Sequence, residues 1–282
     1  MIHILLPTDF SENAWNAMNY AVYLFEKEQC IFYVLHSYQV SPSGLTSKIN
    51  KERDTRLYQV TKEEHERALE NWMQRLEVVK SNPRHNFKGL SVASTLVNAV
   101  GSATMKYNID YIFMGTQGAT GAKEVFMGSN TVGIIKNIDV CPIVAVPSDY
   151  DYDVPDDIMF ATDFKRYFEE VEIKPLIDMA RLWNSRIRVV HIDEEQQLSN
   201  EQQRNKDLLK QRLKGISHIF EDVEPNSNIS KVINAFADKA NIGMVAMVNN
   251  KHSFFEKLTH EPVIKRIAFK TNVPFLVLPE IV

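Results

Sequence analysis

The chain has very few cysteines, with only Cys30 and Cys141 among its 282 residues. Two thiols are too few for a disulfide framework, and their spacing matches no metal site. Glycine and proline are also scarce, at 10 and 11 residues, while 44% of the chain is hydrophobic. This composition excludes collagen-like, disulfide-stapled and disordered proteins, and it favours a globular protein in a reducing compartment.

Long apolar runs and basic clusters are missing as well. No stretch approaches the roughly 18 apolar residues of a membrane-spanning helix. The opening residues MIHILLPTDF lack the basic region and cleavage site of a secretion signal, and we expect them to begin the fold directly with a strand. The net charge is -4, which leaves little capacity for neutralising phosphates of a nucleic acid. We therefore expect a cytoplasmic protein that binds neither membranes nor nucleic acid.

The chain contains an internal repeat. ILLPTDFSENA, starting at Ile4, resembles IMFATDFKRYF, starting at Ile158, and both place Thr-Asp-Phe after an apolar run. A histidine closes the second apolar run of each copy, at His36 and His191, and VCPIVAVP matches NVPFLVLP near the two ends. The polar, proline-bracketed stretch PSDYDYDVP separates the copies. Length and repeat together predict two tandem domains, 1–148 and 155–282.

Each copy alternates short apolar segments with segments of helical periodicity. This alternation predicts right-handed βαβ units and an α/β fold of two tandem Rossmann-like doubly wound domains, each a five-stranded parallel sheet with helices on both faces. The expected strands lie near 2–6, 31–36, 90–94, 111–114, 143–146, 158–161, 187–191, 220–223, 244–247 and 275–278. We read them all as buried strands, apolar on both faces. Ser11 is the expected N-cap of the first helix, and the longer middle of the first copy predicts a long charged helix near 51–80, with Val60 among its apolar residues.

The stretch MGTQGATGAKEVFMGSNT, residues 114–131, lies between a predicted strand and a predicted helix. Gly115 and Gly118 would let a ligand approach the backbone closely. Gly128, Ser129 and Thr131 open the helix, where free N–H groups favour an anion. These residues together predict a phosphate-binding loop. On composition alone, a surface loop followed by a helix cap is an equal alternative.

The spacing of these residues is more specific than the number of glycines. Gly115, two residues, Gly118, nine residues, Gly128 and Ser129 resemble the nucleotide-binding motif of the universal stress protein family. PTDFS after the first strand, a histidine closing the second strand and CPIVAVP as the last strand resemble the same family. The likeness extends over both copies, so the chain is similar to a tandem universal stress protein.

The resemblance implies an ATP site in the first copy, with or without Mg²⁺. Asp9 matches the family's acidic residue near adenine and ribose, and Pro7 and Thr8 shape its turn. Ser37 stands where most members pack an apolar residue on adenine, and Met114 would lie beneath the nucleotide. The residues that match ribose- and phosphate-contacting positions are Gly115, Gly118, Gly128, Ser129 and Thr131, with Asn130 where many members have valine.

Several residues have simpler interpretations. An aspartate after a strand often caps the next helix, so Asp9 could serve the turn, the cap and the ligand, although Ser11 competes for the cap. His36 and His191 are expected to be structural, hydrogen-bonded histidines. Lys123 could reach a terminal phosphate, but an exposed loop lysine is usually only solvated. Both cysteines start strands and are expected to be buried, packed thiols.

The second copy does not keep the glycine pattern. It has Met247, Val248 and Asn249 where the first copy has Met-Gly-Thr, and no glycine follows Gly243. Side chains at these positions would stand where a phosphate must approach, so we predict that the second copy does not bind ATP in the family manner. Asp163 persists, which favours a turn-and-cap role there. A basic segment near 251–266 is expected to be a solvated helix face.

Three functions compete. The favoured one is a nucleotide-binding regulatory stress protein, in which the last strands of the two copies pair within one chain as a pseudo-dimer, as family members pair between chains. A further homodimer and a signalling partner of unknown identity would extend that role. The first alternative is an enzyme with slow ATP hydrolysis or autophosphorylation at Ser129 or Thr131; no catalytic residues or metal ligands are fixed by spacing. The second is a stress scaffold that binds no nucleotide.

Overall fold

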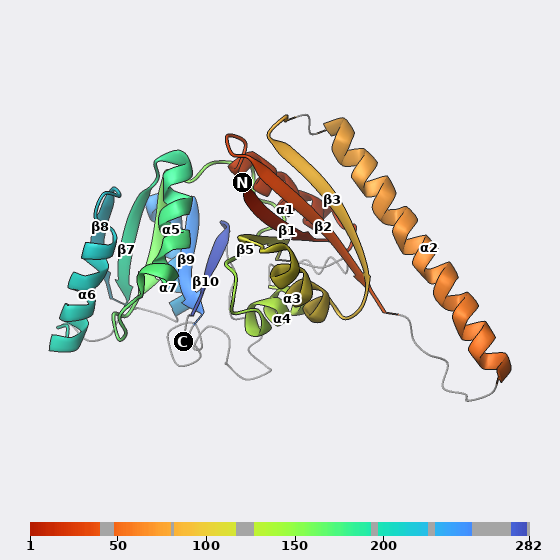
Figure 1. Cartoon of the computed structure of the whole chain (residues 1–282). Helices are drawn as coiled ribbons and strands as arrows, with labels where there is room; N and C mark the ends of the chain where they lie inside the picture. The colour runs from red at the N-terminus through yellow and green to blue at the C-terminus, as the bar shows by residue number, and fades with distance from the viewer. Residues whose placement is uncertain are drawn as a thin grey trace.

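The computed structural model describes residues 1–39, 48–79, 82–116, 127–192, 197–224, 229–249 and 272–280. The ten strands of this part form one continuous sheet in the order β3-β2-β1-β4-β5-β10-β9-β6-β7-β8. Neighbouring strands run parallel except β5 and β10, which pair antiparallel at the centre. The edge strands β3 and β8 therefore lie at opposite ends of the sheet (Figure 1).

The two halves of the sheet follow the same order of elements. The first half contains β1 (Ile2–Pro7), α1 (Glu12–Leu24), β2 (Cys30–Tyr38), α2 (Lys48–Val79), β3 (His85–Ala93), α3 (Leu96–Tyr107), β4 (Tyr111–Gly115), α4 (Ser129–Asn137) and β5 (Ile143–Val146). The second half contains β6 (Asp157–Thr162), α5 (Glu170–Trp183), β7 (Arg186–Ile192), α6 (Asn200–Arg212), β8 (His218–Val223), α7 (Ile229–Ala240), β9 (Met244–Asn249) and β10 (Phe275–Pro279). The predicted fold class is confirmed.

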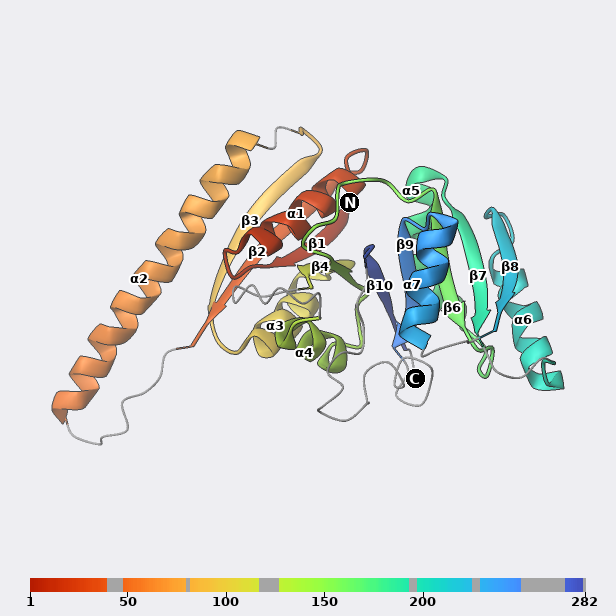
Figure 2. The same ribbon diagram turned by 180° about the vertical axis from the view of Figure 1, so that it is seen from behind.

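Helices cover both faces of the sheet because successive strand residues point to opposite sides. One apolar core packs the sheet against α1, α2, α5 and α6, and the other packs it against α3, α4 and α7. Figure 2 shows α7 lying over the strands of the second half. Both cores continue across the central pair of strands, since Val144 and Leu276 belong to the first core and Ile143 and Phe275 to the second.

The central strand pair confirms the predicted pseudo-dimer contact within one chain. Leu276 lies opposite Val144 in the antiparallel register of β5 and β10. Hydrogen bonds between the halves support this pairing, including Trp183 Nε1 donating to Leu24 O at 2.8 Å and Asn249 Nδ2 donating to Ile135 O at 2.7 Å. The ten strands consequently act as one sheet rather than as two separate ones.

The edge strands differ from the prediction. We expected strands at 90–94 and 220–223 that are apolar on both faces, whereas β3 begins at His85, β8 begins at His218, and most of their residues are half-buried or exposed. Each edge strand has a neighbour on one side only, so its sequence lacks the continuous apolar run of a central strand.

The long helix α2 lies along β3 and β2, and its first turns extend beyond the ends of the strands (Figure 1). Leu69, Trp72 and Leu76 are buried against the sheet. Val60 was expected on this apolar side, but 45% of its surface is exposed, because nine residues of helix separate it from Leu69 and place it on the opposite face. Among the described helices, none is at once long and apolar enough to cross a membrane.

Candidate functional site

The predicted nucleotide site lies at the switch point of the first half of the sheet. There β1 has β2 on one side and β4 on the other, so the chain connections diverge to the two faces. Ligands of doubly wound sheets bind beyond the carboxyl ends of the strands at such a point. Asp9 follows β1, Ser37 is the penultimate residue of β2, and Thr116 follows β4, which brings three segments far apart in the sequence to one edge.

The Thr-Asp-Phe turn after β1 is held by its own side chains. Thr8 Oγ1 accepts from Phe10 N at 3.0 Å, and Asp9 Oδ1 accepts from Ser11 N at 3.1 Å. Phe10 takes φ of 62°, a left-handed conformation that is uncommon for a bulky residue. Its ring packs on His36 with 4.3 Å between ring centroids. The short polar side chains therefore hold a tight turn that leads into α1.

The same turn recurs in the second half. Thr162 Oγ1 accepts from Phe164 N at 3.0 Å, and Asp163 Oδ1 accepts from Lys165 N at 3.1 Å. Phe164 has φ of 54° and stacks on His191 at 5.0 Å. The predicted repeat is thus confirmed at the level of individual hydrogen bonds.

The suggested helix-cap role of the two aspartates is wrong. Ser11 is the N-cap of α1, as predicted, with its side chain accepting from Ala14 N at 3.2 Å. Glu169 is the N-cap of α5. Because each aspartate lies before these caps and bonds the backbone two residues on, it stabilises the turn and not the helix end.

The end of β4 and the start of α4 are joined directly. Thr131 Oγ1 donates to Gly115 O at 2.8 Å, and Gly128 N donates to Thr116 O at 2.5 Å. Thr131 is buried, with 2% of its surface exposed, while Ser129 and Asn130 are exposed at the helix start. The helix begins at Ser129, among the residues expected to open it. Hydroxyl and backbone groups therefore hold α4 with its N-terminus at the carboxyl edge of the sheet.

The N-terminus of α4 differs from those of α1 and α3. Ser11 and Thr95 cap those two helices through their side chains. The N-cap of α4 is Gly128, which provides no side-chain hydrogen bond. The first N–H groups of a helix need a partner and carry a partial positive charge. An anionic group at this end of α4 would supply that partner.

A pair of histidines borders the site beside β2. His36 Nδ1 lies 3.0 Å from Thr8 O, and His36 Nε2 lies 2.9 Å from His65 Nδ1 on α2. Tyr38 stacks on His65 with 4.4 Å between ring centroids. Burial, and to a smaller extent His65, lowers the pKa of His36, against the opposing effects of Thr8 O and Asp9. The prediction of a structural, hydrogen-bonded His36 is confirmed.

The remaining predicted residues have distinct surroundings. Pro7 is buried at the end of β1, and Ser37 is half-buried near the end of β2. Met114 is 5% exposed and belongs to the core on the α3 and α4 face. Gly118, Lys123 and the basic segment of the second copy lie outside the described residues, so the structure brings together only the two ends of the predicted loop.

Two residues beside the site were not predicted. Asn13, on the first turn of α1, packs against Gly115, and His65 comes from α2. His65 could have been found, because it precedes the buried Leu69, Trp72 and Leu76 at helical spacing and so lies on their face. No signal in the sequence pointed to Asn13, because its contact with Gly115 depends on α1 and β4 being neighbours.

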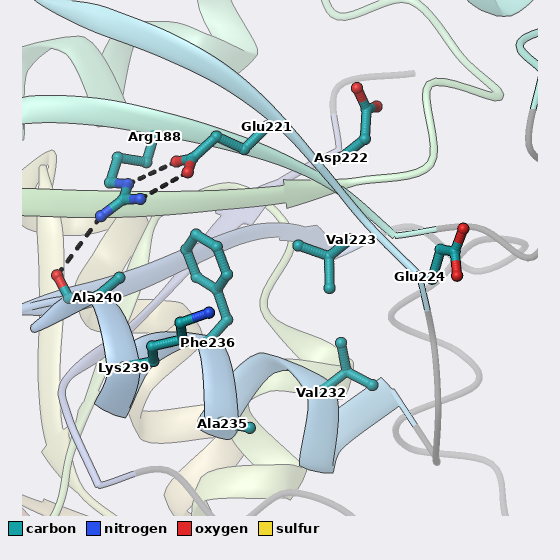
Figure 3. A pocket seen from close by; sticks show the side chains of 10 residues that line it. All are labelled: Arg188, Glu221, Asp222, Val223, Glu224, Val232, Ala235, Phe236, Lys239 and Ala240. Atoms are coloured by element: carbon teal, nitrogen blue, oxygen red, sulfur yellow. Dashed lines mark hydrogen bonds and ion pairs between the residues drawn. The ribbon is translucent and has the colours of Figure 1, made fainter.

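A separate hollow of about 580 Å³ lies in the second half, between β8 and α7 (Figure 3). Arg188 makes a bidentate ion pair with Glu221, with both N–O distances 2.6 Å, and its guanidinium lies 5.0 Å from the Phe236 ring centroid. The hydrogen bonds to Glu221 raise the pKa of Arg188. In the first half Tyr33 occupies the equivalent of Arg188 and stacks on Tyr107 at 4.6 Å. The charges of Arg188 and Glu221 compensate each other. The hollow is lined by residues of the second half, whereas the glycine motif belongs to the first half.

The two cysteines are buried free thiols, as predicted. Burial raises the pKa of Cys30 to about 12 and raises the pKa of Cys141 still further. Cys141 Sγ donates to Ile109 O at 3.4 Å. In the described part of the chain, no group of three or more His, Cys, Asp or Glu residues could hold a metal ion.

Comparisons with known proteins agree with this architecture. The family model described as Universal stress protein family matches residues 1–147. No curated protein matches the chain. A universal stress protein from Archaeoglobus fulgidus DSM 4304 has a similar structure, with a TM-score of 0.63 at 16% identity over 99% of this chain and 96% of that chain. A functionally unknown protein from Pseudomonas aeruginosa PAO1 has a TM-score of 0.60 at 12% identity over 98% and 92% of the two chains. Identities this low show the fold alone.

Proposed function

The chain belongs to the universal stress protein family, and from this premise we propose that its first half, residues 1–148, binds ATP or a related adenine nucleotide. The phosphates would lie at the N-terminus of α4, and the ribose and adenine would lie toward Asp9 and Ser37. A Mg²⁺ ion would accompany the phosphates without a preformed set of protein ligands.

The observation that supports this proposal most is the start of α4. Its N-cap is a glycine without a capping side chain, and Thr131 Oγ1 and Gly128 N tie this end to β4. Helix N–H groups beside a glycine-rich segment at a switch point favour phosphate. Among the residues that the structure describes, no N-cap side chain bonds the first N–H groups of α4, and an anion would do so.

The second half, residues 155–282, would act as a built-in partner. Val248 occupies the position of Gly115 and no glycine follows Gly243, so the glycine pattern of the first half is not repeated. Nucleotide binding would then favour one arrangement of the first half by differential affinity, and a signalling partner would read that arrangement. This makes the protein a regulatory nucleotide binder of the cell interior rather than an efficient enzyme.

The first experiment is to purify the full chain without added nucleotide, denature it, and identify the released small molecules by mass spectrometry. About one ATP per chain is expected from one working site. Two nucleotides per chain would contradict a degenerate second half. Incubating the folded protein with ATP and following ADP release tests the enzymatic alternative, which many turnovers per minute would support.

A titration calorimetry experiment tests the site itself. Thr131→Val removes the hydroxyl that bonds Gly115 O, and it should weaken ATP binding by about tenfold or more. Thr104→Val is a matched control, because Thr104 is 4% exposed and its Oγ1 donates to Val100 O at 2.9 Å, away from the site. Equal affinity of the two variants would contradict the proposed position of the phosphates.

A further inference from the structure

Asn13 occupies the space where any side chain at position 115 would begin. A methyl group at Gly115 would lie 2.8 Å from Asn13 Oδ1 and closer still to Cγ and Nδ2. Real Cβ atoms do not approach other atoms so closely, so one of the two residues would have to move. The contact joins the first turn of α1 to the last residue of β4.

The same strand residue holds the start of α4. Gly115 O accepts from Thr131 Oγ1 at 2.8 Å, and the next residue, Thr116, accepts from Gly128 N at 2.5 Å. A displacement of Gly115 would therefore be passed to Thr131 and Gly128. Asn13 thus packs against the same end of β4 that bonds the start of α4.

In the second half of the chain, both residues of this contact are replaced by others. Counted from the two Thr-Asp-Phe turns, Tyr167 is the equivalent of Asn13, and counted from Met247, Val248 is the equivalent of Gly115. Val248 is 7% exposed, so a full side chain fits in the second half. Tyr167 is 54% exposed and precedes α5, so it does not fill that space.

We propose that Asn13 is a positioning residue of the nucleotide site, and that residue 115 is a glycine because Asn13 lies against it. The inference rests on the proposed function, since it assigns a role within the same site. Asn13 acts on the nucleotide through the end of β4 and the start of α4. The absence of a side chain at 115 serves the packing of two elements rather than the entry of a ligand.

The test is a double-mutant cycle on the full chain, with melting temperature and ATP affinity measured for each variant. Gly115→Ala should lower the melting temperature and weaken ATP binding by about tenfold, because the new methyl group displaces Asn13. Asn13→Ala should weaken ATP binding by about threefold with a small change in melting temperature. The combined variant should regain both properties to the level of Asn13→Ala, because the methyl group then fills the vacated space.

Three results would overturn the proposal. If the combined variant regains its melting temperature but binds ATP as weakly as Gly115→Ala, the glycine serves the nucleotide directly. If it regains neither, the contact with Asn13 is not the reason for the glycine. Unchanged ATP affinity of Asn13→Ala would also contradict a positioning role.

A control on the same helix separates stability from positioning. Asn16 Nδ2 donates to Pro147 O at 2.9 Å, so Asn16→Ala should lower the melting temperature without changing ATP affinity. If the unaltered protein binds no ATP, the proposed function fails along with the positioning role. The melting temperatures of the cycle still report whether Asn13 and Gly115 are coupled, so the two failures are distinguishable.

Discussion

His36 Nε2 and His65 Nδ1 lie 2.9 Å apart, so a histidine at the end of β2 shares a hydrogen bond with a histidine of α2. Thr8 O can only accept, so His36 Nδ1 must carry the hydrogen that reaches it. In neutral His36 the Nε2 atom is then the acceptor, and His65 Nδ1 donates. Protonation of His36 would make Nε2 a donor, so His65 would have to carry its proton on Nε2 for Nδ1 to accept.

This arrangement predicts a loss of stability in mild acid. The pKa of His36 is lowered from its ordinary value of 6.5, mainly by burial, so the unfolded chain takes up the proton first. Stability should be complete above pH 6.5 and should fall as the pH drops below that value. Urea unfolding at pH 7.5 and 5.5 should show this loss, and His36→Asn should reduce it.

A second histidine provides the control for that comparison. His218 Nδ1 lies 2.8 Å from Ile216 O, and its ring packs on Phe220. His218→Asn removes a carbonyl-bonded imidazole without touching the pair of histidines. An equal reduction of the pH effect by both variants would contradict the assignment to His36.

Breaking the buried ion pair of α5 should be costly. Arg166 Nη2 lies 2.5 Å from Glu172 Oε1, and the Glu172 side chain is fully buried. Arg166→Leu removes this cation from a buried carboxylate and should lower the free energy of unfolding by about 3 kcal/mol. Lys174→Leu, which removes an exposed ion pair with Asp178 on the same helix, should cost less than about 1 kcal/mol. Denaturant titrations of both variants check the difference, and equal losses would show that Glu172 does not depend on Arg166.

The two thiols should be unreactive in the folded protein. Cys30 and Cys141 are 2% and 1% exposed, and burial raises the pKa of each. Only the thiolate reacts rapidly with alkylating reagents. Iodoacetamide at pH 8 should therefore label neither residue until guanidinium chloride is added, when both should react. Rapid labelling of the native protein, followed by mass spectrometry of peptides, would contradict this burial.

Trp183 should contribute to the joint between the two halves. Its Nε1 donates to Leu24 O at 2.8 Å, its ring stacks near Tyr23, and Lys27 Nζ lies 3.6 Å above the ring. Trp183→Ala should lower the free energy of unfolding by about 2–3 kcal/mol. Trp183→Phe keeps the ring and loses only the donor, so about 1 kcal/mol is expected. Urea unfolding followed by circular dichroism compares the two, and equal losses would assign the whole effect to the hydrogen bond.

The features predicted correctly from the sequence are the local and repeated ones. The central strands are continuous apolar runs, and Ser11 stands at a boundary where a short hydroxyl side chain can cap a helix. The pairing of β5 with β10 followed from the family resemblance and from the matching ends of the two copies. The first two signals are contained in a few neighbouring residues, and the third is contained in the repeat.

The features that were missed depend on contacts between distant segments. The beginnings of β3 and β8 carry mixed polar and apolar residues, because one side of each strand has no neighbour. His36 and His65 are 29 residues apart, and only the packing of α2 brings them together. The contact of Asn13 with Gly115 requires that α1 and β4 be neighbours, which the spacing of residues does not reveal.

The antiparallel joint of β5 and β10 has a consequence for how the two halves can change. In an assembly of two identical chains, every substitution appears at both sites. Here the partner is attached by a short segment, so its local concentration stays high at any dilution. One site can then lose its glycines while the other keeps them, and the pair remains intact. The two equivalent sites of this chain can therefore carry different residues, whereas the two sites of a homodimer always carry the same ones.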